Sequence, residues 1–262
     1  MAHRPHPILA LLEVRAAPEF GAFAASIPAM KALLPRGNED RHVLVLPGFM
    51  AGDGSTKPLR ALLDRLGHQT HGWGLGRNIG PTTDILEGMI VLVERLALDK
   101  GPIDIVGWSL GGLYGREIAR LHPGAVRQVI TLGSPFQTIG PEESNAKEAF
   151  AALRHRHSDE TKIPRVPSWA REPLTVPATS IYTKGDGIVS WHQCLNRALP
   201  RTENVEVYGS HCGLGHNPAA IWVIADRLAQ RGVEWAPFRP RRVLRALYPN
   251  ADVLDTDRVG AA

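Results

Sequence analysis

Short apolar runs and longer amphipathic segments alternate along the middle of the chain. Six runs have the length and composition of strands, and they cover residues 43–46, 69–75, 103–108, 126–132, 178–183 and 205–208. Between most of them, apolar residues recur every three or four positions, which is typical of helices packed on a core. Strands that alternate with helices favour a parallel sheet covered on both faces. The pattern therefore predicts a doubly wound, mostly parallel α/β sheet of about six strands that begins at His42.

Local signals indicate where the helices begin and end. Ser55 is a suitable N-cap for a leucine-rich helix, and a second helix is expected to start near Thr82. The segment from Ile8 to Leu34 is also helix-like. Because proline interrupts helices, we expect Pro18 and Pro28 to break this segment.

The interval 136–177 does not fit the alternation, because it is rich in charge and proline, with one helical piece around Ala146–His155. Long insertions in compact domains are usually functional, so we interpret it as a small helical lid after the fourth strand; a plain surface excursion is the alternative. The predicted organisation is an N-terminal helical segment (1–41), a core (42–135 and 178–231), the lid (136–177) and a tail (232–262). For the tail, a short docked helix is expected, with a membrane-surface contact as the alternative.

Composition narrows the functional classes. The 262 residues are 44% hydrophobic, which is enough for a sizeable core, and the net charge is only +4. The chain has no basic block with interleaved aromatic residues, so nucleic-acid binding is not expected. The N-terminal apolar run is too short for a secretory signal, and no run reaches the length of a membrane span. We therefore expect a cytoplasmic protein without an integral membrane segment, with export by other routes left open.

Gly107-Trp108-Ser109-Leu110-Gly111 carries the chemistry. It reads G-x-S-x-G between an apolar strand and a helix-like run, which is the setting of a nucleophile elbow. The serine of an elbow takes strained backbone angles, and the flanking glycines avoid collisions across the tight turn. The helix that follows brings free N–H groups to the serine, where they can stabilise an oxyanion.

This motif in its strand–turn–helix setting resembles the α/β-hydrolase fold, and more closely its bacterial lipase and esterase members. The resemblance covers about His42 to Gln230. It implies the chain order serine, acid, histidine. Asp186, between two glycines after the fifth strand, then becomes the acid, although Gly-Asp-Gly is also turn chemistry. His211 becomes the base because it follows the sixth strand, and His216 is the alternative.

The resemblance also implies two backbone donors to the oxyanion. One is the N–H of Leu110, directly after the nucleophile. The other belongs to the loop after the first strand, where Phe49 is the first choice and Met50 the alternative. Pro47 stands in this loop where lipases usually have a histidine that is thought to brace it.

Aromatic and apolar residues near the strand ends predict a pocket for an apolar group. The predicted pocket residues are Met50, Trp73, Arg77 and Trp108. The glycine-dense loop 72–78 resembles a phosphate loop only weakly and is better interpreted as a pocket wall, although Arg77 could meet an anionic substrate. No Cys/His spacing suggests a metal, and no cofactor is expected.

The only two cysteines, Cys194 and Cys212, follow the predicted acid and base. A disulfide could tie the two loops together. The reducing cytosol argues for free thiols, and both alternatives stay open.

The expected function is cleavage of a small-molecule carboxylic ester with an apolar acyl or alcohol part, by a Ser109–His211–Asp186 triad through an acyl-enzyme. The same triad could serve a thioesterase or an acyltransferase. A non-catalytic binding protein is the remaining alternative, which the complete triad disfavours. The sequence sets neither the acyl length nor the oligomeric state.

Overall fold

A single parallel sheet forms the centre of the protein. The computed structural model describes residues 4–37, 40–137, 144–157, 174–230 and 234–250. Six parallel strands lie in the order β2-β1-β3-β4-β5-β6. Their bounds are β1 His42–Leu46, β2 Gln69–Gly72, β3 Ile103–Trp108, β4 Val126–Leu132, β5 Ala178–Tyr182 and β6 Thr202–Glu206. The predicted α/β class, the strand number and the start at His42 are confirmed.

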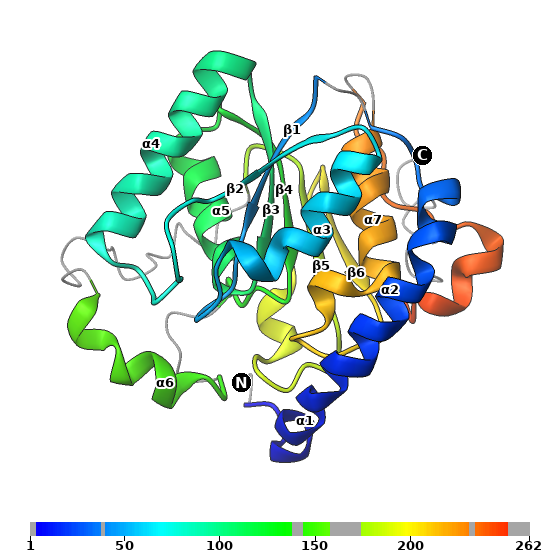
Figure 1. Ribbon diagram of the computed structural model, residues 1–262, viewed down its shortest axis with the longest axis horizontal. Coiled ribbons are helices and arrows are strands. Elements are labelled where there is room, and N and C mark those ends of the chain that lie inside the picture. Colours follow the sequence, from blue (N-terminus) through cyan, green and yellow to red (C-terminus); the bar gives the residue numbers. More distant parts are fainter. Residues whose placement is uncertain (1–3, 38–39, 138–143, 158–173, 231–233, 251–262) are drawn as a thin grey trace.

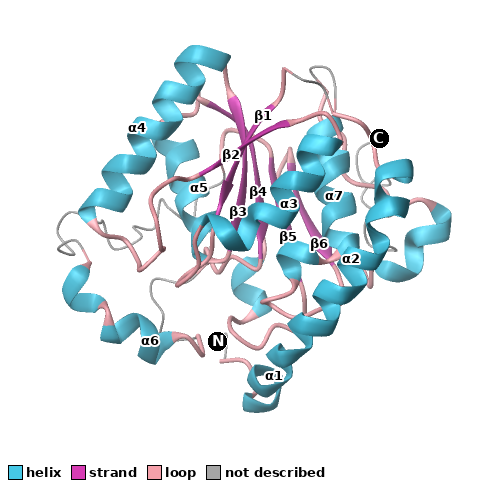
Figure 2. Ribbon diagram, in the orientation of Figure 1, coloured by secondary structure: helices cyan, strands magenta, loops and turns pink. Residues whose placement is uncertain are grey.

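Helices cover both faces of this sheet (Figure 2). The α-helices are α1 Pro7–Leu11, α2 Ala16–Leu33, α3 Asp53–Arg65, α4 Thr83–Lys100, α5 Leu110–Leu121, α6 Lys147–Ala152 and α7 Pro218–Ala229. Short 3₁₀ helices are η1 Leu12–Arg15, η3 Arg154–Arg156, η5 Trp191–Cys194, η6 Leu214–His216 and η7 Arg242–Leu247. In Figure 1 the strands run downward, so their carboxyl ends face α1 and α6 at the lower edge.

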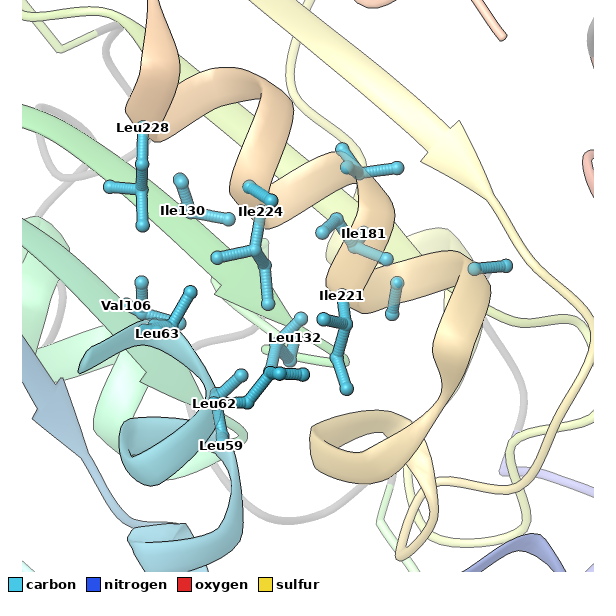
Figure 3. Close-up of a cluster of buried hydrophobic side chains, with 14 of the residues drawn as sticks. Leu59, Leu62, Leu63, Val106, Ile130, Leu132, Ile181, Ile221, Ile224 and Leu228 are labelled. Atoms are coloured by element: carbon cyan, nitrogen blue, oxygen red, sulfur yellow. The ribbon is translucent and has the colours of Figure 1, made fainter. Parts of the chain in front are cut away.

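The alternation of side chains along the strands divides the core in two. Val43 and Val45 of β1 point to one face and pack with α2, α3 and α7, whereas Leu44 and Leu46 point to the other and pack with α4 and α5. Figure 3 shows the first cluster, in which Leu62 of α3 lies close to the sheet residues and to α7. The strands β1, β3 and β4 lie between these two clusters and are buried almost throughout. This burial explains why the sequences of these strands are continuously apolar.

Polar residues shift the bounds of two strands from those predicted. The second strand ends at Gly72, not residue 75, because the Asp53 carboxylate accepts the N–H groups of Trp73 and Gly74 and turns the chain away. The sixth strand runs from Thr202 to Glu206 instead of over 205–208, so it begins with polar residues. Its Glu203 is nevertheless buried, because it accepts hydrogen bonds from Thr179 and from Arg227 of α7.

Helix starts are predicted with mixed success. Thr82 caps α4 as expected, and its hydroxyl accepts the N–H of Ile85. Helix α3 begins at Asp53 with Gly52 as the N-cap, so the prediction of Ser55 as the cap is wrong. The Ser55 hydroxyl instead donates to the carbonyl of Gly52 from inside the first turn.

The two N-terminal prolines do not break the helix as expected, because α2 is continuous from Ala16 to Leu33. Pro18 lies in the first turn, where a backbone N–H has no acceptor within the helix. Pro28 does remove one helical hydrogen bond, at a typical cost of about 3 kcal/mol. Phe23 and Met30 on either side of it are buried, and their packing keeps the helix whole.

The tail docks on the core as predicted. Phe238 and Tyr248, which flank the 3₁₀ helix η7, are both buried with their rings 5.0 Å apart. The Phe238 N–H donates to Glu203 and the Tyr248 hydroxyl donates to the carbonyl of Ala219. Within the described ranges, no helix combines the length and apolar character needed to cross a bilayer.

The packing of α3 gives a direct test of the core. Leu63 is fully buried between α3 and the sheet. We expect Leu63→Ala to lower the free energy of unfolding by about 2–5 kcal/mol, because it leaves a cavity. Leu98→Ala is the matched control, since that leucine lies on α4 with 87% of its surface exposed. Urea unfolding followed by circular dichroism measures both, and equal midpoints for the two variants would contradict the packing.

Candidate active site

Ser109 lies at a sharp turn between β3 and α5. Its backbone angles are φ 52° and ψ −119°, a region that non-glycine residues rarely occupy. A Cβ atom at Gly107 would come within 2.3 Å of the Gly112 Cα, and one at Gly111 within 2.5 Å of the Leu46 carbonyl oxygen. The turn therefore needs glycine at both positions, and the strand–turn–helix geometry agrees with that of a nucleophile elbow.

Asp186 and His211 form a short hydrogen bond across the loops that follow β5 and β6. His211 Nδ1 lies 2.6 Å from Asp186 Oδ2, and both side chains are buried. The other oxygen, Oδ1, accepts the N–H groups of Ile188 and Val189 at 2.8 Å each. Asp186 thus makes the local turn with one oxygen and faces the histidine with the other, so the turn chemistry of Gly-Asp-Gly is compatible with the predicted role as the acid.

The electrostatics of this pair favour a basic imidazole. Burial disfavours the charged form of His211, but the Asp186 carboxylate and its hydrogen bond outweigh burial, and the pKa of His211 rises above its ordinary value of 6.5. Nδ1 faces Asp186, which leaves Nε2 as the ring nitrogen that can take up a proton. The pair has the arrangement of a general base held in one orientation by a carboxylate.

Gly133 brings the elbow and the buried pair together. The Ser109 N–H donates to the Leu132 carbonyl at 2.8 Å, one residue before Gly133. A Cβ atom at Gly133 would lie 3.0 Å from His211 Nδ1 and 3.2 Å from Asp186 Oδ2, and the backbone has φ +54°. The end of β4 is therefore in contact with all three predicted triad residues.

His216, the alternative base, has a different environment. Its ring packs edge-on against Phe20 and Trp108, with centroids 5.2 and 5.3 Å away. Burial lowers its pKa, and no acidic side chain pairs with it among the described contacts. These contacts give His216 a packing role beneath the loop after β6 that carries His211, which we call the base loop.

The loop after β1 approaches the elbow closely. A Cβ atom at Gly48 would lie 3.3 Å from the Ser109 Cβ, so a side chain at Gly48 would crowd the serine. The N–H of Met50, the alternative oxyanion donor, is already bonded to the Asn78 carbonyl at 2.7 Å. Within the described residues, no hydrogen bond occupies the N–H of Phe49. This difference favours Phe49 over Met50 as the donor.

Comparisons with known proteins identify the family to which the chain belongs. The model of the alpha/beta hydrolase family matches residues 20–258. The chain belongs to the alpha/beta hydrolase family. None of the curated protein sequences matches it.

Solved structures with the same fold include lipases and a thioesterase. Lipase B of Aspergillus fumigatus has a TM-score of 0.55 at 16% identity, over 73% of this chain and 53% of that one. This chain thus spans only about half of that lipase. The monoacylglycerol lipase of Paleococcus ferrophilus scores 0.52 at 14% identity, over 73% and 96% of the two chains. The thioesterase domain of the curacin biosynthetic pathway scores 0.50 at 15% identity, over 74% and 93%. At these identities the likeness concerns the fold.

In this hydrolase, Asn78 braces the loop after β1. Asn78 is fully buried, and its Nδ2 donates to the Pro47 carbonyl at 2.9 Å. Its backbone N–H bonds Ala51, and its Oδ1 accepts the hydroxyl of Tyr114. Asn78 therefore takes on the bracing that the absent lipase histidine was expected to provide. Apart from the position of Asn78 in the glycine-dense loop, no sequence pattern predicts this role.

The four predicted pocket residues occupy different environments. Trp108 is half-buried, and its indole N–H donates to the His211 carbonyl at 3.1 Å, which makes it a support of the base loop. Trp73 is 1% exposed in the core, with its indole bonded to the Gly76 carbonyl, a position that favours a structural role. Met50 is 44% exposed and Arg77 is exposed. Their contacts with a substrate stay predictions.

The segment interpreted as a lid reaches the same end of the sheet. Helix α6 and η3 confirm the predicted helical piece, whereas residues 138–143 and 158–173 lie outside the described ranges. The Phe150 ring of α6 lies 5.3 Å from that of Phe49, and His157 Nε2 bonds the Ile79 carbonyl at 2.8 Å. The described part of the insertion thus packs on the predicted oxyanion loop.

The two cysteines are not joined. Both are free thiols, so the disulfide considered from the sequence is not formed. Cys194 is fully buried beside Tyr182 and Val189, whereas Cys212 is exposed on the base loop. Burial raises the pKa of the Cys194 thiol. Although Cys212 is partly accessible, the packing around its thiol and the nearby Glu13 carboxylate raise its pKa to about 12. In the described part of the chain, no three His, Cys, Asp or Glu side chains converge in a way that could hold a metal ion.

Three residues of the N-terminal segment, which belong to no recognisable motif, also contact the loops of Asp186 and His211. They are Glu13, Arg15 and Glu19. Only a fold that returns η1 and the start of α2 to the carboxyl ends of β5 and β6 brings them there.

The position of Gly133 predicts a sensitive substitution. We expect Gly133→Ala to disrupt the Asp186–His211 hydrogen bond, because the new methyl group would press on both side chains and the backbone angle disfavours alanine. The far-downfield proton NMR signal of the His211 Nδ1–H should shift or disappear. Gly54→Ala is the control, since a Cβ atom there meets no atom within 4 Å. An unchanged signal in Gly133→Ala would contradict the geometry.

Proposed function

We propose that this alpha/beta hydrolase cleaves carboxylic esters of small molecules, with Ser109 as nucleophile, His211 as general base and Asp186 as its orienting acid. The observation that carries the proposal is the 2.6 Å bond between His211 and Asp186, on loops that reach the strained turn of Ser109 through Trp108 and Gly133. A binding protein would need neither the strain at Ser109 nor a buried, oriented imidazole at the same end of the sheet.

The mechanism follows from the positions of these groups. His211 Nε2 takes the Ser109 proton while Oγ attacks the ester carbonyl. The N–H groups of Phe49 and Leu110 stabilise the oxyanion; loss of one such donor typically costs about 3 kcal/mol. The alcohol leaves with the proton from His211, and a water molecule activated by the same nitrogen then releases the acid.

Apolar side chains around the oxyanion loop support an apolar substrate. Phe49 and Phe150 pack against each other, and Met50 of the same loop is 44% exposed. An acyl chain or an apolar alcohol could be buried against these side chains, whereas a charged group would lose its hydration without a partner. A thioester presents the same carbonyl chemistry, so thioesters form the second arm of the test.

The triad assignment predicts the effect of three substitutions on a series of p-nitrophenyl esters with increasing acyl length. Ser109→Ala and His211→Ala should each lower kcat by on the order of 10⁵- to 10⁶-fold, as in other serine hydrolases. His216→Ala should keep most of the activity, because His216 packs against aromatic rings and has no acid partner.

Two outcomes would contradict this assignment. Activity that survives in Ser109→Ala would exclude Ser109 as the nucleophile, and a larger loss in His216→Ala than in His211→Ala would reverse the choice of base. If the wild type turns over none of the esters, nor a matching series of acyl thioesters, the proposed reaction itself is wrong.

The raised pKa of His211 predicts the pH dependence. A general base must be neutral, so kcat/KM should rise with pH through the pKa of His211, and the acid limb should have its midpoint above 6.5. Asp186→Asn removes the negative charge that favours the imidazolium, so the midpoint should move to lower pH while kcat falls on the order of 10⁴-fold. Initial rates measured about every half pH unit between pH 5 and 9 resolve this shift. An unchanged midpoint in Asp186→Asn would contradict the claim that Asp186 raises the pKa of the base.

A further inference from the structure

The carboxylate of Glu13 joins the loop after β5 that carries Asp186, called the acid loop, to the loop after β6 that carries His211, called the base loop. Its Oε1 accepts the N–H of Gly187 at 2.8 Å and the N–H of His211 at 3.0 Å. Its Oε2 accepts the N–H of Cys212 at 2.8 Å. Gly187 directly follows Asp186, so a single side chain from η1 bonds the backbone beside one partner of the buried pair and the backbone of the other partner.

Arg15, two residues later, bridges the same two loops as a hydrogen-bond donor, whereas Glu13 is an acceptor. Its Nη2 donates to the carbonyls of Gly185 and Gly209, the latter at 2.9 Å. The loops thus present N–H groups to the anion and carbonyls to the cation. A Cβ atom at Gly187 would come within 2.2 Å of the Leu9 carbonyl oxygen, so α1 also lies directly against the acid loop.

Glu19 differs from Glu13 in a useful way. It comes from the same N-terminal segment and bonds only the base loop, through the N–H of Ser210 at 3.0 Å and the Ser210 hydroxyl at 2.6 Å. It also pairs with Arg15 at 3.5 Å. Both glutamates are half-buried carboxylates with backbone donors, but only Glu13 spans the two loops.

We propose that Glu13 is a positioning residue for the proposed reaction, which holds Asp186 and His211 at their hydrogen-bonding distance by joining the two loops that carry them. The inference rests on the proposed function of this pair. It gives the N-terminal segment a part in the active site that the sequence motifs of the fold do not reveal. Charge-assisted bonds from a carboxylate to backbone N–H groups are stronger than neutral ones, which suits them to fixing loops.

Glu13 also acts on His211 through its charge. Burial disfavours the ionised carboxylate, but its three backbone donors and the neighbouring imidazole outweigh burial, and the pKa of Glu13 falls below its ordinary value. Glu13 is therefore an anion throughout the pH range in which His211 titrates, and it adds to the rise in the pKa of His211 that Asp186 causes. Other titratable and charged groups packed around the base loop are Arg15, Glu19, Cys212 and His216.

Glu13→Gln tests the inference, because it keeps the shape of the side chain and removes the charge and one acceptor. We expect kcat/KM to fall on the order of 10- to 100-fold, because the pair loses its alignment. The midpoint of the acid limb should move to lower pH, and the downfield signal of the His211 Nδ1–H should weaken or shift. Glu13→Asp keeps the charge but shortens the reach, so its acid limb should stay near that of the wild type while its rate falls.

Glu19→Gln is the matched control. It should leave the acid limb in place, because Glu19 bonds a single loop. If Glu13→Gln leaves both the acid limb and the Nδ1–H signal unchanged while Ser109→Ala and His211→Ala abolish activity, the positioning role is wrong and the triad stands. Equal shifts in Glu13→Gln and Glu19→Gln would overturn the assignment to Glu13 in particular.

Hydrogen exchange on the unmodified protein tests the same bonds even if a variant does not fold. The amides of Gly187, His211 and Cys212 lie in loops, yet they should exchange much more slowly than the amide of the exposed turn residue Gly124, which has no acceptor among the described residues. Exchange at these three amides as fast as at Gly124 would show that the bonds to Glu13 are absent, and would overturn the inference.

Discussion

The hydrogen bond between Asp186 and His211 is the constraint on which the carboxyl end of the sheet depends. The two residues come from different loops, and each loop is free to move unless other contacts hold it. Asp186 is fixed by the turn that its own Oδ1 makes with Ile188 and Val189. His211 is fixed from below by the Trp108 indole, which bonds its carbonyl. Gly133 has no side chain, and this leaves room for the bond itself.

The apolar strands and the glycine-flanked turn at Ser109 could be predicted because their physical causes are local. A buried parallel strand needs a continuous apolar run, and a tight turn at Ser109 needs Gly107 and Gly111. The start of the sixth strand was missed because Glu203 is polar, and a polar residue enters a core only with partners that come from elsewhere. Here the partners are Thr179 and Arg227, which no local pattern could reveal.

The same reason explains what remained hidden in the site. Asn78 braces the loop after β1 from a segment about thirty residues further along the chain, and Glu13 reaches loops that are far more distant in sequence. Neither role leaves a periodic or motif-like trace, because each depends on where tertiary structure brings one side chain. Helix α2 is a related case, because the packing of Phe23 and Met30 outweighs the tendency of Pro28 to break the helix.

Placing a second carboxylate beside the proposed Asp–His pair raises the question of repulsion between Glu13 and Asp186. The fold avoids this cost by giving each carboxylate its own donors: Asp186 has the N–H groups of Ile188 and Val189, and Glu13 has those of Gly187, His211 and Cys212. Both charges are thus stabilised by fixed backbone dipoles that do not titrate. The imidazole of His211 is then the group near them that gains a proton as the pH falls, and both carboxylates raise its pKa. On this argument the N-terminal segment stabilises the loops and tunes the base through the same carboxylate.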